Sequence, residues 1–178
     1  MTLERSTRRV WPMKAVMIIV ALAVTAAATP AQTSADAPLV VKGAVKQELR
    51  LTAADLKAMT RVKVSAKDHD GVAREYEGVA LQTLLAKAGA PLGGELRGKN
   101  MTLVVVAEAG DGYHAVFSLA ELDADFLNTQ VLVADMEDGK PLDAQHGPLR
   151  LVVPGDKRQG RWVRMLKSIS IQKAADSQ

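Results

Sequence analysis

Cysteine is absent from all 178 residues of the chain. This absence excludes disulfides, thiolate metal sites and cysteine nucleophiles, whatever compartment the protein occupies. A Gly-x-Ser-x-Gly elbow is absent as well, and Ser65, Ser118, Asp68 and His114 match no motif of a nucleophilic triad. The sequence therefore carries no independent hydrolase signal.

Histidine is scarce, with His69, His114 and His146 in the whole chain. No two of them show the i, i+4 or short-loop spacing that is typical of metal sites. Spacing therefore predicts no metal site. Two alternatives stay open: a metal site formed by histidines that are distant in sequence, and an enzyme that ligates a metal differently, around Asp68 and His69.

A membrane span needs roughly 20 apolar residues, and the apolar run near the N-terminus is shorter. AVMIIVALAVTAAA has 14 residues, follows the basic leader MTLERSTRRVWPMK and precedes small residues. We predict that residues 1–31 are a signal peptide, cut after Ala31 or after Ala28. The mature chain is then periplasmic or secreted, with no stable membrane anchor after cleavage.

The leader also contains Thr7-Arg8-Arg9, followed by Trp11 and Lys14. This order resembles a twin-arginine export signal, a route that carries folded cargo. Pro12 departs from the usual pattern, so an ordinary secretory leader with adjacent arginines explains the sequence equally well.

Residues 32–178, which remain once the leader is removed, carry no formal net charge. The whole chain has 23 basic and 20 acidic side chains, and residues 32–178 hold 19 of each. Net charge therefore gives no ground for nucleic-acid binding. The charge is polarised, however: residues 108–143 hold nine acidic side chains and one lysine, and residues 147–173 hold seven basic side chains and one aspartate.

Short alternating strands and brief helices follow the polar lead-in at residues 32–38. The sequence predicts a short helix capped by Thr52, a helix with apolar residues spaced from Val79 to Ala88 that Gly89 ends, and a helix over residues 119–126 with a Ser118–Glu121 capping box. Asp70-Gly71 is a predicted hairpin turn. The apolar run MTLVVVAEA predicts a central strand that is covered on both faces. We predict an α+β fold with a mixed, largely antiparallel sheet as a single domain over residues 39–173, followed by a tail at 174–178.

Three blocks of the sequence resemble one family in their order and spacing. They are YEGVALQTLLAKAGA, GDGYHAVFSLAEL and VLVADMEDGKPLDAQHGPLRLVVPG. Together they are similar to the oxidoreductase molybdopterin-binding domain of sulfite oxidase and its bacterial relatives, over about residues 39–172. The resemblance implies that family's fold, its pterin-dithiolene molybdenum cofactor and two-electron oxygen-atom transfer or reduction.

The chain departs from this family at the metal ligand. The family's cysteine thiolate comes from a loop after the strand that here reads RVKVSAKDHDG, where this chain offers Ser65, Ala66, Lys67, Asp68 and His69. Soft sulfur holds molybdenum in such sites, and neither a hydroxyl nor an imidazole reproduces a thiolate. The sequence therefore argues against molybdenum and against redox catalysis, and whether the chain is an enzyme stays open.

The resemblance also implies the residues that hold the pterin phosphate. Lys157, Arg158 and Arg161 occupy the matching loop, Arg150 matches the arginine before Val-Pro-Gly, and His146 belongs to the His-Gly motif. Convergent guanidinium groups stabilise an anion well. A solvated basic loop, or one that pairs with the acidic segment, explains the same residues. Trp162 either stacks on a pterin or an arginine plane, or closes the edge of the core.

Two functions remain. The first is an exported protein of the sulfite oxidase fold that binds a pterin cofactor or another small anion through these five residues. The second is a non-catalytic periplasmic accessory module that docks a protein partner through its acidic and basic poles.

Overall fold

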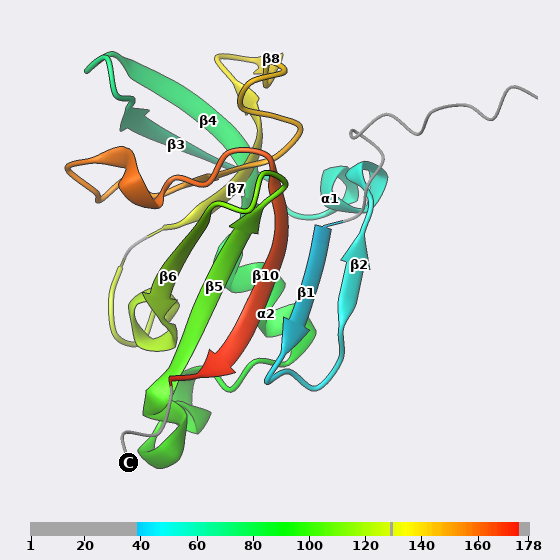
Figure 1. Cartoon of the computed structure of the whole chain (residues 1–178), viewed down its shortest axis with the longest axis vertical. Helices are drawn as coiled ribbons and strands as arrows, with labels where there is room; N and C mark the ends of the chain where they lie inside the picture. The colour runs from blue at the N-terminus through cyan, green and yellow to red at the C-terminus, as the bar shows by residue number, and fades with distance from the viewer. Residues whose placement is uncertain (1–38, 129, 175–178) are drawn as a thin grey trace, which may run out of the picture. The chain divides into compact units, whose positions relative to one another are not determined.

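The computed structural model describes residues 39–128 and 130–174, so the predicted leader and lead-in lie outside the described residues. In that part of the chain, no helix is long and apolar enough to cross a membrane. The described residues form two β-sheets with short helices beside them (Figure 1).

Each sheet has a defined strand order. Sheet A has the order β2-β1-β10-β5-β6, and sheet B has the order β3-β4-β7-β8 with β9 paired to β7. β1 and β10 are parallel, and the other strand pairs of the described residues are antiparallel. This confirms the predicted α+β class and the largely antiparallel pairing, although the strands form two sheets where one was predicted. The strands are β1 (Leu39–Gly43), β2 (Leu49–Leu51), β3 (Val62–Lys67), β4 (Ala73–Ala80), β5 (Leu103–Ala109), β6 (His114–Ser118), β7 (Leu132–Glu137), β8 (Lys140–Pro141), β9 (Arg150–Val152) and β10 (Leu166–Lys173).

The helices are short, and α1 begins directly after the predicted cap residue Thr52, whereas the N-cap of α2, Ala80, makes no side-chain hydrogen bond. In α1 (Ala53–Ala58), the Thr52 hydroxyl accepts from the Asp55 main-chain N–H while the Asp55 carboxylate accepts from that of Thr52. This reciprocal pair satisfies two main-chain donors at the helix start. α2 (Leu81–Ala88) ends at Gly89, whose φ of 73° lies in the left-handed region. The 3₁₀ turns are η2 (Gly93–Glu95), η3 (Gly98–Thr102), η4 (Leu119–Leu122) and η5 (Gln159–Arg161).

Two predicted helical segments are shorter than expected. Val79 lies in β4, and the helix begins only at Leu81. The predicted helix over residues 119–126 is the single turn η4, although its Ser118–Glu121 capping box is present. The Asp123 carboxylate accepts from the main chain of Gly93 and Asp125, so it closes a turn where a helix would continue.

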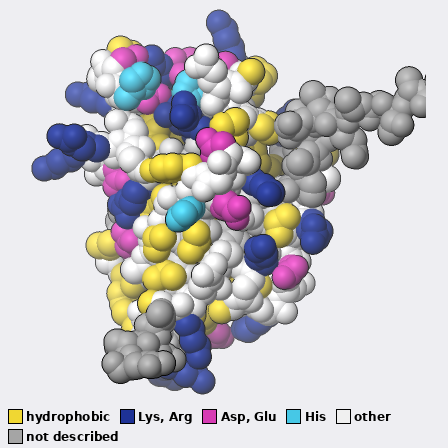
Figure 2. All heavy atoms as spheres, viewed as in Figure 1, with side chains coloured by type: hydrophobic (Ala, Val, Ile, Leu, Met, Phe, Trp, Pro, Cys, Tyr) yellow, Lys and Arg dark blue, Asp and Glu magenta, His cyan; other side chains and the backbone are white. Residues whose placement is uncertain are grey.

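β5 occupies the predicted central position, between β10 and β6. Its inward residues Leu103, Val105 and Ala107 are buried, whereas Val104 and Val106 are partly exposed. The prediction that both faces of this strand are covered is therefore wrong. Figure 2 shows the outer side of sheet A, where hydrophobic side chains alternate with polar ones.

Several strand ends converge at one end of sheet A (Figure 1). β5 ends there at Ala109, and β10 begins there at Leu166, paired with it. The Met165 main-chain N–H donates to the His146 carbonyl, which draws the turn before β9 to the same place. This convergence forms the candidate site.

Candidate functional site

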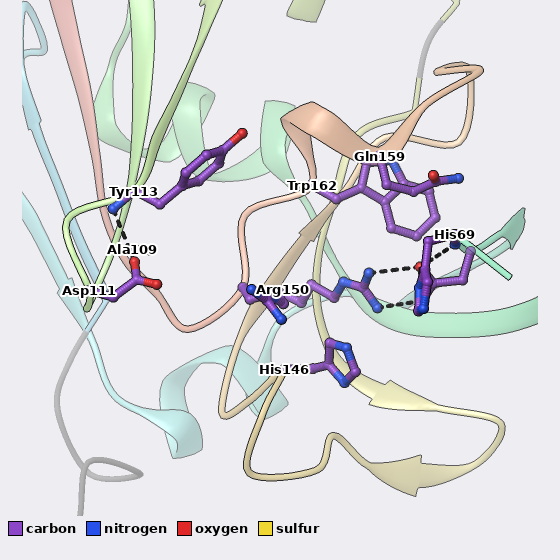
Figure 3. A pocket seen from close by; sticks show the side chains of 10 residues that line it. His69, Ala109, Asp111, Tyr113, His146, Arg150, Gln159 and Trp162 are labelled. Carbon is purple, nitrogen blue, oxygen red and sulfur yellow. Dashed lines mark hydrogen bonds and ion pairs between the residues drawn. The ribbon is translucent and has the colours of Figure 1, made fainter.

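A pocket of about 370 Å³ lies where these strand ends meet. Figure 3 shows Asp111 and Tyr113 on one side, His69 on the other, and Arg150 between them. Trp162 and Gln159 come from the segment that follows β9. The lining residues are Asp68, His69, Ala109, Asp111, Tyr113, His146, Arg150, Gln159, Trp162 and Arg164.

The floor of this pocket is a buried ion pair between Arg150 and Asp68. The two Nη atoms of Arg150 donate to Asp68 Oδ2 at 2.8 Å and to Oδ1 at 3.1 Å. Arg150 is 3% exposed and Asp68 is 5% exposed. Such forked pairing is the strongest geometry for a guanidinium and a carboxylate. Because both groups are buried, removal of either one would leave the other as an uncompensated buried charge.

Two aromatic side chains enclose the pair. The Tyr76 hydroxyl donates to Asp68 Oδ2 at 3.0 Å, and Tyr76 is fully buried. The Arg150 guanidinium carbon lies 5.0 Å from the Trp162 ring centroid, and the Tyr76 and Trp162 rings meet edge to face. Trp162 Nε1 donates to the Val153 carbonyl at 3.0 Å, which fixes the indole. Trp162 thus stacks on an arginine plane and closes the core edge at once.

The surroundings hold Asp68 ionised. Burial opposes ionisation of the carboxyl, but hydrogen bonds from Arg150 and from the His69 main chain outweigh it and lower the pKa of Asp68 well below its ordinary range. Burial raises the pKa of Tyr76 above its ordinary range, so its hydroxyl keeps the proton that it donates.

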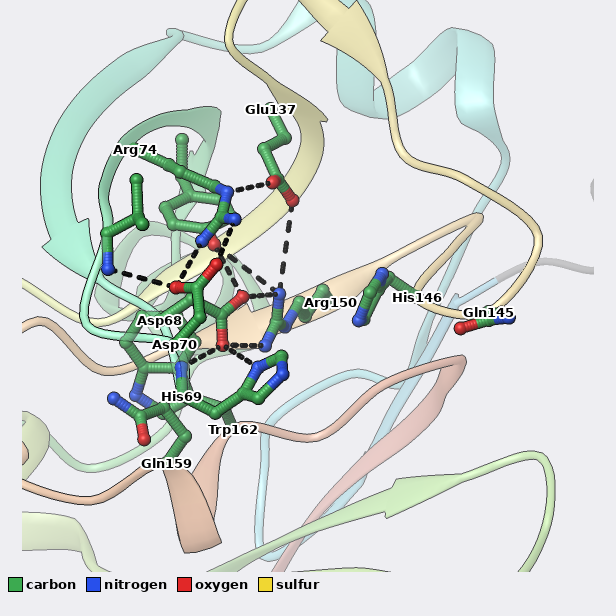
Figure 4. Close-up of polar contacts among 12 residues, drawn as sticks. Asp68, His69, Asp70, Arg74, Glu137, Gln145, His146, Arg150, Gln159 and Trp162 are labelled. Carbon is green, nitrogen blue, oxygen red and sulfur yellow. Dashed lines mark hydrogen bonds and ion pairs between the residues drawn. The ribbon is translucent and has the colours of Figure 1, made fainter.

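Further ion pairs flank the floor in Figure 4. Arg74 pairs with both Asp70 and Glu137, and the nearer Glu137 oxygen lies 4.0 Å from an Arg150 nitrogen. Asp70 also accepts from the Val72 main-chain N–H, which closes the predicted hairpin turn between β3 and β4. These contacts hold the segment that carries Asp68 against β4 and β7.

The rim of the pocket carries titratable groups of both signs. His69 Nδ1 lies 3.1 Å from Asp68 Oδ1, and His146 Nδ1 lies 2.9 Å from Asp143 Oδ1. Arg164 is exposed on the rim and has no ion pair within the described residues. The rim therefore offers one uncommitted guanidinium beside two imidazoles.

Two of the five residues predicted to bind a cofactor line this pocket: His146 and Arg150. Lys157 and Arg158 are exposed and do not line it. Arg161 binds the Asp156 carboxylate through two nitrogens and Glu121 through a third, and it lies over the Phe117 ring. Hydrogen bonding to Asp156 raises the pKa of Arg161 above its ordinary value. The structure thus leaves these three cations out of the pocket lining, although Gln159 of the same loop belongs to it.

Asp68, Tyr76 and Arg164 were missing from the predicted site. A signal for Asp68 was present in the sequence, because Val64 and Ala66 precede it at the period of two that marks one face of a strand. Asp68 continues that inward series, and an inward charge needs a partner. The sequence suggests Asp68 as an alternative metal ligand beside His69 and does not reveal its buried arginine partner.

A comparison of the sequence with models of protein families shows to which family the chain belongs. The model of the oxidoreductase molybdopterin binding domain matches residues 26–178. The chain belongs to this family. A comparison with curated proteins gave no match.

Among solved structures, the fold is similar to the sulfane dehydrogenase SoxCD from Paracoccus pantotrophus. The TM-score is 0.64 and the identity is 24%, over 82% of this chain and 40% of that chain. This member of the family thus spans less than half the length of its structural neighbour. The similarity supports the predicted sulfite oxidase-like fold.

The cofactor implied by the family is molybdenum held by a pterin dithiolene, and the pocket residues do not fit such a metal. The chain has no thiolate, and Asp68, which directly follows β3, is committed to Arg150 through both carboxylate oxygens. Within residues 39–128 and 130–174, no three His, Asp or Glu side chains are grouped to hold a metal ion. A hard, already paired carboxylate does not replace a soft thiolate.

Proposed function

We propose that this family member is an exported, non-catalytic binding module that takes a small anion at the rim of its pocket. The proposal rests on the ion pair between Asp68 and Arg150. It commits the buried guanidinium to the chain's own carboxylate and leaves no soft ligand at the pocket floor. Export rests on the predicted leader at residues 1–31.

Arg164 is the residue proposed to hold the anion. Its exposed guanidinium can donate two parallel hydrogen bonds to a phosphate or a carboxylate. His69 and His146 line the same pocket and add positive charge when protonated, whereas Asp111, which also lines it, repels an anion. The anion is therefore proposed to contact Arg164 and the two imidazoles and to avoid Asp111.

Thermal stabilisation by inorganic phosphate and sulfate tests this site. An anion bound only by the folded protein raises Tm by mass action. We expect a saturable rise that Arg164→Ala abolishes and that Arg158→Ala, which also removes one exposed arginine, retains. A rise that survives Arg164→Ala but not Arg158→Ala would place the anion on the basic loop and overturn the rim site.

Metal and pterin content test the non-catalytic part of the proposal. The protein is purified from a periplasm whose host makes the molybdenum cofactor, and molybdenum is measured together with oxidised-pterin fluorescence. We expect neither. Stoichiometric amounts of both would establish a cofactor-loaded protein and contradict the proposal.

A protein partner is the alternative, and the exposed Lys157 and Arg158 favour it. Neither forms an ion pair within the part of the chain that the structure describes, so both are available to an acidic surface. Crosslinking in the periplasm tests this idea. A crosslinked partner that is lost in the Lys157→Glu, Arg158→Glu variant supports docking through the loop, and an unchanged pattern contradicts it.

A further inference from the structure

The carboxylate at the pocket floor receives a complete set of donors. Arg150 donates twice, the Tyr76 hydroxyl donates at 3.0 Å, and the His69 main-chain N–H donates to Oδ1 at 2.7 Å. Four donors therefore converge on the two oxygens of one side chain. Such a set is what a protein uses to bind a free oxyanion.

Most of these donors are held by elements other than the turn that carries Asp68. Arg150 begins β9, and Tyr76 lies in β4. Trp162, which packs on both of these side chains, is itself fixed by its hydrogen bond to Val153. Both rings and the guanidinium are almost fully buried. The donors are thus preorganised by packing, and we expect them to keep their arrangement when the Asp68 carboxylate is removed by substitution with alanine.

The Arg150 guanidinium depends on Asp68 for its close hydrogen-bond acceptors. Its Nε is buried and has no hydrogen-bond partner within the described residues. Both of its close hydrogen bonds go to the Asp68 carboxylate, whereas the Tyr76 hydroxyl accepts from Nη1 at 3.4 Å and the nearer Glu137 oxygen lies 4.0 Å away. A buried guanidinium that loses its carboxylate strongly favours the uptake of another anion.

We propose that Asp68 is an internal ligand that occupies an oxyanion subsite formed by Arg150, Tyr76 and the His69 main chain. In the native protein this carboxylate excludes small oxyanions from the pocket floor. Without it, the subsite accepts a small planar monoanion of the carboxylate class, whose two oxygens match the forked geometry of the guanidinium. The subsite is separate from the rim site at Arg164 and does not depend on it.

Chemical rescue tests this inference. Thermal unfolding of the full mature chain carrying Asp68→Ala is followed in increasing sodium formate, with sodium chloride of equal ionic strength as the reference. We expect a saturable rise in Tm with formate for Asp68→Ala and no difference between the two salts for the unchanged protein. Asp68→Asn fills the same volume and should show no formate-specific rise.

Three further variants show where the formate binds. Asp156→Ala removes a carboxylate from another forked pair, but Arg161 in that pair is more exposed than Arg150, so we expect no formate-specific rise. Asp68→Ala combined with Arg150→Met should lose the response, and Asp68→Ala combined with Arg164→Ala should keep it. Loss of the response in the Arg164 combination alone would place the formate at the rim and overturn the subsite.

Failure to fold would not obscure the result. If Asp68→Ala is unfolded in sodium chloride, recovery of folded protein in formate supports the inference, and no recovery overturns it. If the variant is folded and responds equally to both salts, the inference is wrong. The phosphate response of Arg164 in the otherwise unchanged protein is measured separately, so either proposal can fail alone.

Discussion

The Gln159 side-chain amide donates a hydrogen bond to the Lys67 carbonyl, 2.7 Å away, across 92 positions of sequence. Lys67 ends β3, and the next residue is Asp68. On the other side, the Tyr113 hydroxyl donates to the Gly160 carbonyl. The basic loop is therefore tied to both sides of the pocket, although Lys157, Arg158 and Arg161 do not line it.

Gln159→Ala should release this loop. A neutral hydrogen bond contributes about 1 kcal/mol, so amide hydrogen exchange over residues 155–161 should accelerate by roughly fivefold. The control is Gln172→Ala, because that amide donates to Ser170 within the same strand and bridges no two elements. Equal exchange of this loop in both variants would show that Gln159 does not restrain it.

Tyr76→Phe should destabilise the domain without opening a cavity. The variant deletes a buried donor to an ionised carboxylate, and the expected loss in the free energy of unfolding is about 2 kcal/mol. Urea denaturation measures it. Tyr113→Phe is the matched control, since Tyr113 is 50% exposed and its loss should cost well under half as much. A Tyr76 variant as stable as the unchanged protein would refute the role of the hydroxyl.

Acid should weaken the domain through Asp68. Because the pKa of this carboxyl is lowered in the folded state, its stabilisation is complete above the ordinary aspartate pKa, about 4, and is lost as pH falls below that value. Asp68→Asn should reduce the free energy of unfolding by about 3 kcal/mol at pH 7. The difference from the unchanged protein should shrink between pH 4 and pH 3, as measured by urea midpoints, and a constant difference would contradict this.

Gly78→Ala should be poorly tolerated. A Cβ at this position of β4 would lie 2.0 Å from the Val133 carbonyl oxygen of β7, so the two strands would have to separate. We expect a loss of about 3 kcal/mol in urea denaturation. At Gly94, a Cβ would meet no atom within 4 Å, and Gly94→Ala should change stability by less than about 0.5 kcal/mol. Similar losses at both positions would refute the packing argument.

The local signals in the sequence predicted local structure well. The Thr52 cap, the Ser118–Glu121 capping box, the Gly89 terminus and the Asp70-Gly71 turn all form as expected, because each depends on hydrogen bonds between residues a few positions apart. The family blocks also predicted the fold correctly.

The site was harder to predict because its contacts join distant parts of the chain. Asp68 and Arg150 are 82 positions apart, and they meet through the pairing of β3 with β4, of β4 with β7 and of β7 with β9. Local charge density favoured Lys157, Arg158 and Arg161 instead. Their role in binding a cofactor stays a prediction, and Arg161 shows why charge alone misleads, since two carboxylates already satisfy it.

The parallel pairing of β1 with β10 has a mechanical consequence. The register from Val40–Ser168 to Gly43–Ile171 places the start of β1 near one end of sheet A and the end of β10 at the other. A force that pulls residues 39 and 173 apart slides these strands along each other, so it loads their hydrogen bonds together and not one after another. Stretched from its two ends, the domain should resist extension until this pair ruptures in a single step.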